Sequence, residues 1–206
     1  MKKRAGIAFI ISLSCLGFLF CPVYHDTHAD VSDGLVVYYP FDGTLEDLAG
    51  GNDGVKHGGD AVYVQGKQGQ AIQLDGVNDY VRCGAVLTSA MRSSISISLW
   101  ASRMENDINN VGILVSQATS AKWPPYTLYF SPTDTPGNPV NSFAWYLNAD
   151  GTDSGLYWNN SDNKFSDKER WYHVVVTYDG AGSEVRLYVD GQQEVINPGG
   201  GTIPAM

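Results

Sequence analysis

The segment from residue 171 to residue 191 constrains the fold of this chain more than any other. It holds two runs rich in β-branched and aromatic residues, WYHVVVTY and VRLYV, and each run is followed directly by Asp-Gly. Asp-Gly after such a run is a strong signal for a tight turn between antiparallel strands. No helical period fits either run, so the segment predicts two consecutive antiparallel strands.

The second run has the alternation of a strand with two different faces. Val185, Leu187 and Val189 are apolar, and Arg186 and Tyr188 stand between them. Side chains of a strand point alternately to the two faces of its sheet, so one face of this strand must be covered by a core. One sheet cannot cover its own apolar face, and turn signals recur along the chain. We therefore predict an all-β fold, an antiparallel two-sheet β-sandwich or jelly roll.

Similar runs occur throughout the chain after residue 34. In the clearest one, Ile95, Ile97 and Leu99 share one face, and three serines share the other. The serines suit a concave face that a ligand approaches, and a plain solvated sheet face is the alternative interpretation. No window has the period of an amphipathic helix, and we expect strands at 35–41, 61–65, 70–75, 79–83, 94–101, 111–116, 126–131, 141–147, 155–159, 171–178, 184–190 and 192–196.

Six segments occur in one order along the chain: 35–43 (LVVYYPFDG), 51–54 (GNDG), 66–76 (GKQGQAIQLDG), 78–81 (NDYV), 94–100 (SISISLW) and the hairpin at 171–191. This ordered set resembles the laminin-G-like, or concanavalin A-like lectin/glucanase, jelly-roll domains of secreted bacterial proteins. The resemblance covers residues 34–196. It implies the same two-sheet fold and leaves the ligand open, because a fold does not determine what it binds.

The first 29 residues have the three parts of a secretory signal peptide. Three basic residues follow Met1, an apolar run occupies residues 5–20, and a polar tail ends in Thr-His-Ala. A membrane anchor is the alternative, but a spanning helix needs about 20 apolar residues. We expect export with cleavage after Ala29, which leaves residues 30–206 as a single laminin-G-like domain in a secreted or cell-surface protein.

The chain is acidic, with a formal net charge of −9. Removal of the basic leader makes it more so, and such a surface repels nucleic-acid phosphates and anionic lipid. We therefore expect no nucleic-acid partner and no membrane contact after cleavage. Cys83 is the one cysteine beyond the leader, so we expect no intrachain disulfide and a buried thiol there.

The other end of the chain departs from the family pattern. Members continue past a strand like 194–196 with further strands, one of which returns to pair beside the first. Here Pro and Gly dominate residues 197–206, which is typical of a turn or linker. We expect a C-terminally truncated chain in which the strand at 35–41 lacks a partner, an aggregation hazard.

One proline-stiffened segment has the composition of a sugar-binding loop. Pro124 and Pro125 separate Trp123 from Tyr126 and restrict the backbone between them. Aromatic rings held outward in this way offer flat apolar plates to sugar rings, and a preordered loop loses less entropy on binding. Trp123 and Tyr126 are therefore the candidate ligand-binding residues. The alternative is that Trp123 packs over the rim of the sandwich.

Calcium is the one cofactor that the resemblance suggests, since some laminin-G-like domains bind it at the sandwich edge. The matching positions are Asp42, Asn52, Asp53 and Asp75. Calcium takes six to eight oxygen ligands, so other segments would have to contribute. Asp-Gly and Asn-Asp-Gly are also ordinary turn formers, which is the alternative reading. We read Asp79, Asp179 and Asp190 as turn or strand-end residues.

Catalytic patterns are incomplete. Jelly-roll glycoside hydrolases carry Glu-x-Asp-x-x-Glu on a strand, and retaining chemistry needs two carboxyl groups about 5 Å apart. Here the last position of that pattern, after Glu105 and Asp107, is Asn110. His173 lies inside a predicted core strand, and we read it as a hydrogen-bonded structural histidine. We therefore expect no enzyme.

The function predicted from the sequence is that of an exported, noncatalytic module that binds a carbohydrate or an extracellular protein, with calcium as a possible support. The alternatives are a structural fragment of a larger surface protein and a degenerate jelly-roll glycoside hydrolase. The ligand and the oligomeric state are left open.

Overall fold

The computed structural model describes residues 7–10, 34–84, 86, 94–103, 111–117, 126–131, 141–148, 156–160, 167, 169–179 and 184–198. This part of the chain holds strands and no helix, and so it contains no helix that could cross a membrane. The strands are β1 Ile7–Ile10, β2 Val55–His57, β3 Val62–Gln65, β4 Gln70–Leu74, β5 Tyr80–Arg82, β6 Ser94–Arg103, β7 Gly112–Ser116, β8 Tyr126–Ser131, β9 Ser142–Asn148, β10 Leu156–Asn160, β11 Trp171–Asp179, β12 Glu184–Val189 and β13 Gln192–Pro198.

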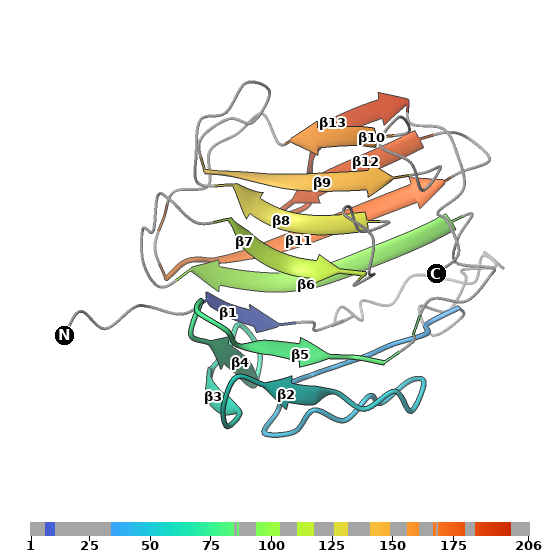
Figure 1. Cartoon of the computed structure of the whole chain (residues 1–206). Coiled ribbons are helices and arrows are strands. Elements are labelled where there is room, and N and C mark those ends of the chain that lie inside the picture. Colours follow the sequence, from blue (N-terminus) through green and yellow to red (C-terminus); the bar gives the residue numbers. More distant parts are fainter. Residues whose placement is uncertain are drawn as a thin grey trace, which may run out of the picture.

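The strands form an antiparallel β-sandwich, as predicted. One layer is a seven-stranded sheet in the order β13-β12-β11-β6-β1-β4-β3. The other layer holds a four-stranded sheet, β10-β9-β8-β7, and a two-stranded sheet, β2-β5. Figure 1 shows the four-stranded sheet in front of β6, β11 and β12, and the two-stranded sheet in front of β3 and β4.

The main core lies between the four-stranded sheet and the strands β6, β11 and β12. Alternating residues of these strands point into it. Leu99 on β6, Val174 and Val176 on β11, and Leu187 on β12 are at most 1% exposed. Trp145 of β9 fills the facing layer and is fully buried. The residues between them form the opposite face of the seven-stranded sheet, which we name the outer face.

A second, smaller core lies between β3, β4 and the two-stranded sheet. It contains Ile72 and Leu74 of β4 together with Tyr39 and Phe41 from the segment before β2. The two cores are separate clusters, and Leu114 of β7 touches both of them. The sandwich therefore has two packing units side by side.

The strand expected at 35–41 does not form. Tyr39 and Phe41 are buried as a strand would bury them, but the backbone N–H of Tyr38 donates to the carboxylate of Asp47 at 2.8 Å. Phe41 has a φ of 59°, in the left-handed region, which ends any extended run. A side chain has therefore taken the hydrogen bond that a neighbouring strand would have accepted.

The other expected strands after residue 60 are present, with ends shifted by one or two residues. Two strands were not expected. One is β2, only three residues long, which pairs with β5. The other is β1, which lies inside the predicted leader and pairs antiparallel with both β4 and β6.

Candidate functional site

An open hollow of about 560 Å³ lies on the outer face of the seven-stranded sheet. Three parts of the chain line it: the turn between β3 and β4, the strand β6, and the start of β11 with the turn that follows β12. The lining residues are Lys67, Trp100, Arg170, Trp171, His173, Asp190 and Gly191. Aromatic rings and charged side chains therefore share one small surface.

A tight turn holds one wall of the hollow. Asp190 and Gly191 are the two residues between β12 and β13, with φ values of 51° and 78°. Positive φ at both central positions is the mark of the type I′ turn that matches the twist of a hairpin. The prediction that Asp190 is a turn residue is thereby confirmed. The turn brings the carboxylate of Asp190 to the start of β11.

The carboxylate of Asp190 fixes the start of β11 through both of its oxygens. The backbone N–H of His173 donates to Oδ1 at 2.9 Å, and Nη2 of Arg170 donates to Oδ2 at 2.8 Å. The guanidinium of Arg170 lies 4.7 Å from the centre of the Tyr172 ring, which holds it from another side. Arg170 is exposed and prepositioned, so it can donate to a ligand without being ordered first.

The floor of the hollow is a stack of rings. Trp100 and His173 are register partners on β6 and β11, and their rings lie 4.9 Å apart at 27°. Nε2 of His173 is 2.9 Å from Oγ of Ser98. Burial lowers the pKa of His173, and the charge of Asp190 opposes that shift. The lowered pKa favours the neutral imidazole at neutral pH.

Lys67 closes the side of the hollow toward β4. Its Nζ lies 5.2 Å from the centre of the Trp100 ring, a cation–π contact. Trp171, next to Arg170 at the start of β11, is half-buried and contributes a second indole. Aromatic faces flanked by an amine, a guanidinium, an imidazole and a carboxylate suit a ligand with apolar ring faces and hydroxyl edges.

A profile of the concanavalin A-like lectin/glucanases superfamily matches residues 75–205. The chain belongs to this superfamily. The expected resemblance is thus confirmed, and so is the expected β-sandwich of the concanavalin A-like type. No curated protein matches the sequence.

Among solved structures, the superfamily fold is shared with domain 4 of AbnA, a GH43 extracellular arabinanase from Geobacillus stearothermophilus, in complex with arabinotriose. The TM-score is 0.56 and the sequence identity is 19%, over 82% of this chain and 77% of that chain. At this identity the likeness shows the fold alone.

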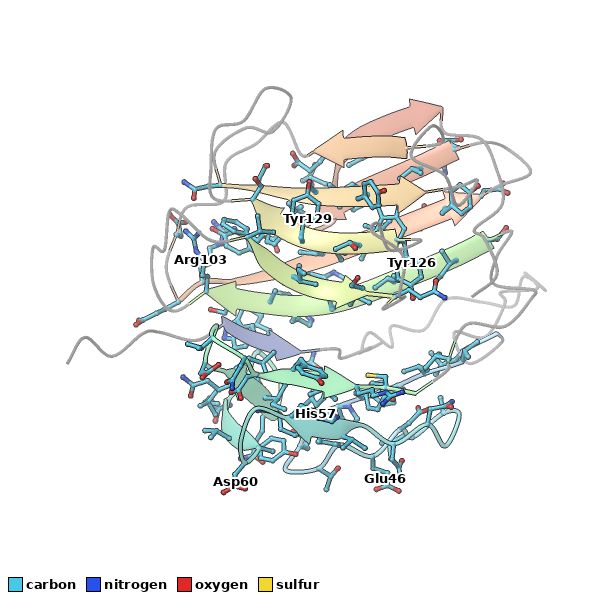
Figure 2. The ribbon with its side chains drawn as sticks, in the orientation of Figure 1. Glu46, His57, Asp60, Arg103, Tyr126 and Tyr129 are labelled. Atoms are coloured by element: carbon cyan, nitrogen blue, oxygen red, sulfur yellow. The ribbon has the colours of Figure 1, made fainter. Side chains whose placement is uncertain are left out.

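The two predicted ligand-binding aromatics have different outcomes. Trp123 lies outside the described residues. Tyr126, at the start of β8 (Figure 2), stacks on the buried Trp145 with ring centres 5.3 Å apart and packs against the main core. Burial raises the pKa of Tyr126 to about 12. Its ring is therefore a structural contact of the four-stranded sheet, and a ligand role for it stays a prediction.

The predicted calcium residues Asp42, Asp53 and Asp75 accept backbone hydrogen bonds. Oδ1 of Asp42 accepts the backbone N–H of Gln70 at 2.6 Å, and Oδ1 of Asp53 accepts the backbone N–H of Asp47 at 3.0 Å. Oδ1 of Asp75 accepts three successive backbone N–H groups, from residues 77, 78 and 79.

Asn52 contributes its backbone to the same region, with its N–H on Asp47 and its carbonyl accepting the hydroxyl of Tyr39. Within the described residues, no three His, Cys, Asp or Glu side chains gather as ligands for a metal. The four predicted residues are not part of such a group in the described part of the chain, and calcium binding stays a prediction from the sequence.

Other candidates are placed as follows. His173 is hydrogen-bonded, as expected, but it lies on the outer face and not in the core. Cys83 is partly buried and packs against the second core, and burial raises the pKa of its thiol. Glu105, Asp107 and Asn110 lie outside the described residues.

The residues that line the hollow were not predicted from the sequence to lie together. Alternation along β11 was a usable signal, because it places Trp171 and His173 on the face opposite Tyr172 and Val174. What the sequence does not contain is the register that puts His173 beside Trp100, or the turn that carries Lys67 there.

Proposed function

We propose that this superfamily member is an exported, noncatalytic carbohydrate-binding module, and that the hollow around Trp100 and Trp171 is its sugar site. The observation that carries the proposal is the combination of two indoles with four hydrogen-bonding side chains on one open surface. A pyranose or furanose ring stacks its C–H face on an indole, while its hydroxyl groups exchange hydrogen bonds with charged and imidazole groups.

The fold relative supports a carbohydrate as the ligand class. The arabinanase domain with this fold was solved in complex with arabinotriose. Arabino-oligosaccharides are therefore the first ligands to test, followed by other neutral oligosaccharides. The openness of the hollow favours the middle of a polysaccharide chain, because a strand of sugar units can lie across it without ending there.

A binding role without catalysis is supported by the chemistry of the lining. Among the residues that line the hollow, Asp190 supplies the one carboxyl group, and its oxygens accept hydrogen bonds from Arg170 and His173. The carboxylate of Asp167, beside the hollow, is paired with Nη1 of Arg170 at 3.3 Å. Hydrolysis of a glycosidic bond uses a pair of carboxyl groups across the bond. Export is supported by the tripartite pattern of residues 1–29.

The test is binding of soluble oligosaccharides to the full chain and to Trp171→Ala, measured by isothermal titration calorimetry. We expect the substitution to weaken binding about tenfold or more, equivalent to about 1.4 kcal/mol, because it removes one stacking surface. Tyr188→Ala is the matched control, since Tyr188 is an aromatic residue of β12 that does not line the hollow.

Retention of wild-type affinity in Trp171→Ala, with unfolding unchanged, would place the sugar site elsewhere. Equal losses of affinity in Trp171→Ala and Tyr188→Ala would indicate that any large substitution on the outer face weakens binding, and would not support a site at the hollow. Absence of binding by the wild-type chain across the panel would refute the carbohydrate proposal.

A further inference from the structure

The seven-stranded sheet depends on β1 for its continuity. β1 pairs antiparallel with β4 on one side and with β6 on the other, as an inner strand of the sheet. Figure 1 shows β1 between the upper strands and the group formed by β2 to β5. Among the described strands, β1 is what joins β3 and β4 to β6, β11, β12 and β13 by backbone pairing.

The same four residues lie in the apolar run of the expected leader peptide. Residues 7–10 belong to the run 5–20, upstream of the expected cleavage after Ala29. Cleavage separates them covalently from the sandwich. The position between β4 and β6, which we name the β1 position, then has backbone N–H and C=O groups facing it from two strands.

The register defines what fits the β1 position. Residue 9 is in register with Ile72 of β4 and Ala101 of β6, both buried on the core side. Residue 7 is in register with Leu74, which is also on the core side. Residue 8 is in register with Gln73 and Ser102, on the outer face. An occupant therefore needs apolar residues at alternate positions and tolerates a polar residue between them.

We infer that the β1 position is an acceptor site for an extended peptide strand with apolar residues at alternate positions, supplied in trans once the leader has been cut. The peptide enters antiparallel to both neighbours and completes two ladders at once. Affinity comes from main-chain hydrogen bonds, and selectivity comes from the two core-side positions. In the uncut chain, Ile7–Ile10 occupies the site in cis.

The experiment uses the full chain with a weakened cis strand. Phe9→Asp puts a charge at the register position of Ile72 and Ala101, where a buried unpaired carboxylate is strongly unfavourable. A fluorescein-labelled peptide of residues 5–14, with lysines added at both ends for solubility, is titrated against this variant and against the wild-type chain by fluorescence anisotropy.

We expect the peptide to bind the Phe9→Asp chain at least about tenfold more tightly than the wild-type chain, in which the cis strand competes. Two altered peptides are the matched controls. A peptide with Phe9→Asp loses binding, and a peptide with Ala8→Thr binds like the native one, because residue 8 is in register with the outer face.

Equal binding of the native and Phe9→Asp peptides would overturn the inference, and so would absence of binding to the variant chain. If the variant chain fails to unfold cooperatively, the native peptide should restore a cooperative thermal transition, and no restoration would also overturn it. Self-association of the variant that the native peptide does not reverse would show that a second copy fills the position, against the inference.

Discussion

The carboxylate of Asp47 organises the segment before β2, and Asp47→Asn tests how much it contributes. Asp47 is 5% exposed, although the surrounding loop is largely exposed. Each of its oxygens accepts two backbone N–H groups. Oδ1 accepts those of Tyr38 and Ala49 at 2.8 and 3.0 Å, and Oδ2 accepts those of Gly50 and Asn52 at 3.1 and 3.0 Å.

Two related arguments, both resting on these four hydrogen bonds, give the size of the effect. Burial by itself raises the pKa of Asp47, but the four backbone hydrogen bonds outweigh it and hold the pKa at about 2, against an ordinary value of 3.8. That difference corresponds to about 2 kcal/mol of stability from the ionised form. In Asp47→Asn one oxygen becomes an NH2 group facing two N–H donors, and leaving such groups unsatisfied costs about 1–3 kcal/mol each. We expect a total loss of about 3 kcal/mol near neutral pH.

The pH dependence follows from the direction of the shift. Because the folded-state pKa of Asp47 is below the unfolded one, its contribution is complete above about pH 4 and is lost as the pH falls toward about 2, with about 1 kcal/mol gone at about pH 3. The free-energy gap between wild type and Asp47→Asn should narrow by that amount.

Urea unfolding followed by tryptophan fluorescence, at about pH 7 and about pH 3, measures both quantities. Glu46→Gln is the control, since Glu46 is exposed at the lower margin of Figure 2 and undergoes the same change of charge. The reasoning would be refuted if Asp47→Asn lowered the free energy of unfolding by less than about 0.5 kcal/mol at about pH 7. It would also be refuted if the difference between wild type and variant were the same at both pH values.

Two further predictions concern the same half of the sandwich. Lys56 and Asp79 form an ion pair at 2.5 Å with side chains only 6% and 12% exposed. Lys56→Met should therefore destabilise the fold by about 3–5 kcal/mol in urea unfolding, while Arg82→Met, at an exposed position on the partner strand, should cost less than about 0.5 kcal/mol; equal losses would contradict the burial argument. Asp42→Ala removes the acceptor for the N–H of Gln70 and should lower stability by about 1–2 kcal/mol equally with excess calcium and with excess EDTA. A loss seen only with calcium would instead establish Asp42 as a metal ligand.

Most of the sheet framework was predictable from local signals. The β11–β12 hairpin could be predicted because β-branched and aromatic runs are each followed by Asp-Gly, and β6 could be predicted because isoleucine and leucine alternate with serine at its start. The strand expected at 35–41 failed for a reason that composition does not reveal. Asp47 competes for the backbone of Tyr38, and Phe41 adopts a left-handed conformation.

The candidate site was predicted much less well. Trp100, His173 and Lys67 come from three distant parts of the chain, and only strand register and a turn bring them together. A prediction based on neighbouring residues selects instead a segment such as 123–126, whose Tyr126 belongs to a structural ring stack. The pairing of residues 7–10 with β4 and β6 was hidden because an apolar run near a start methionine is also the pattern of a leader.

The hollow draws its residues from both sides of β1, so the two binding equilibria that we propose would be linked. Lys67 comes from the β3–β4 turn, whereas Trp100 belongs to β6, and β1 stands between these strands in the sheet order. A chain with an empty β1 position loses the backbone pairing that joins the β3–β4 hairpin, which carries Lys67, to β6, which carries Trp100. If sugar binds the hollow and a strand binds the β1 position, as we propose, thermodynamic linkage requires reciprocity: a strand that enters the β1 position and restores this arrangement raises the affinity for sugar, and bound sugar raises the affinity for the strand by the same factor. The domain would then bind a saccharide and a polypeptide cooperatively, and each ligand would be held most tightly when the other is present.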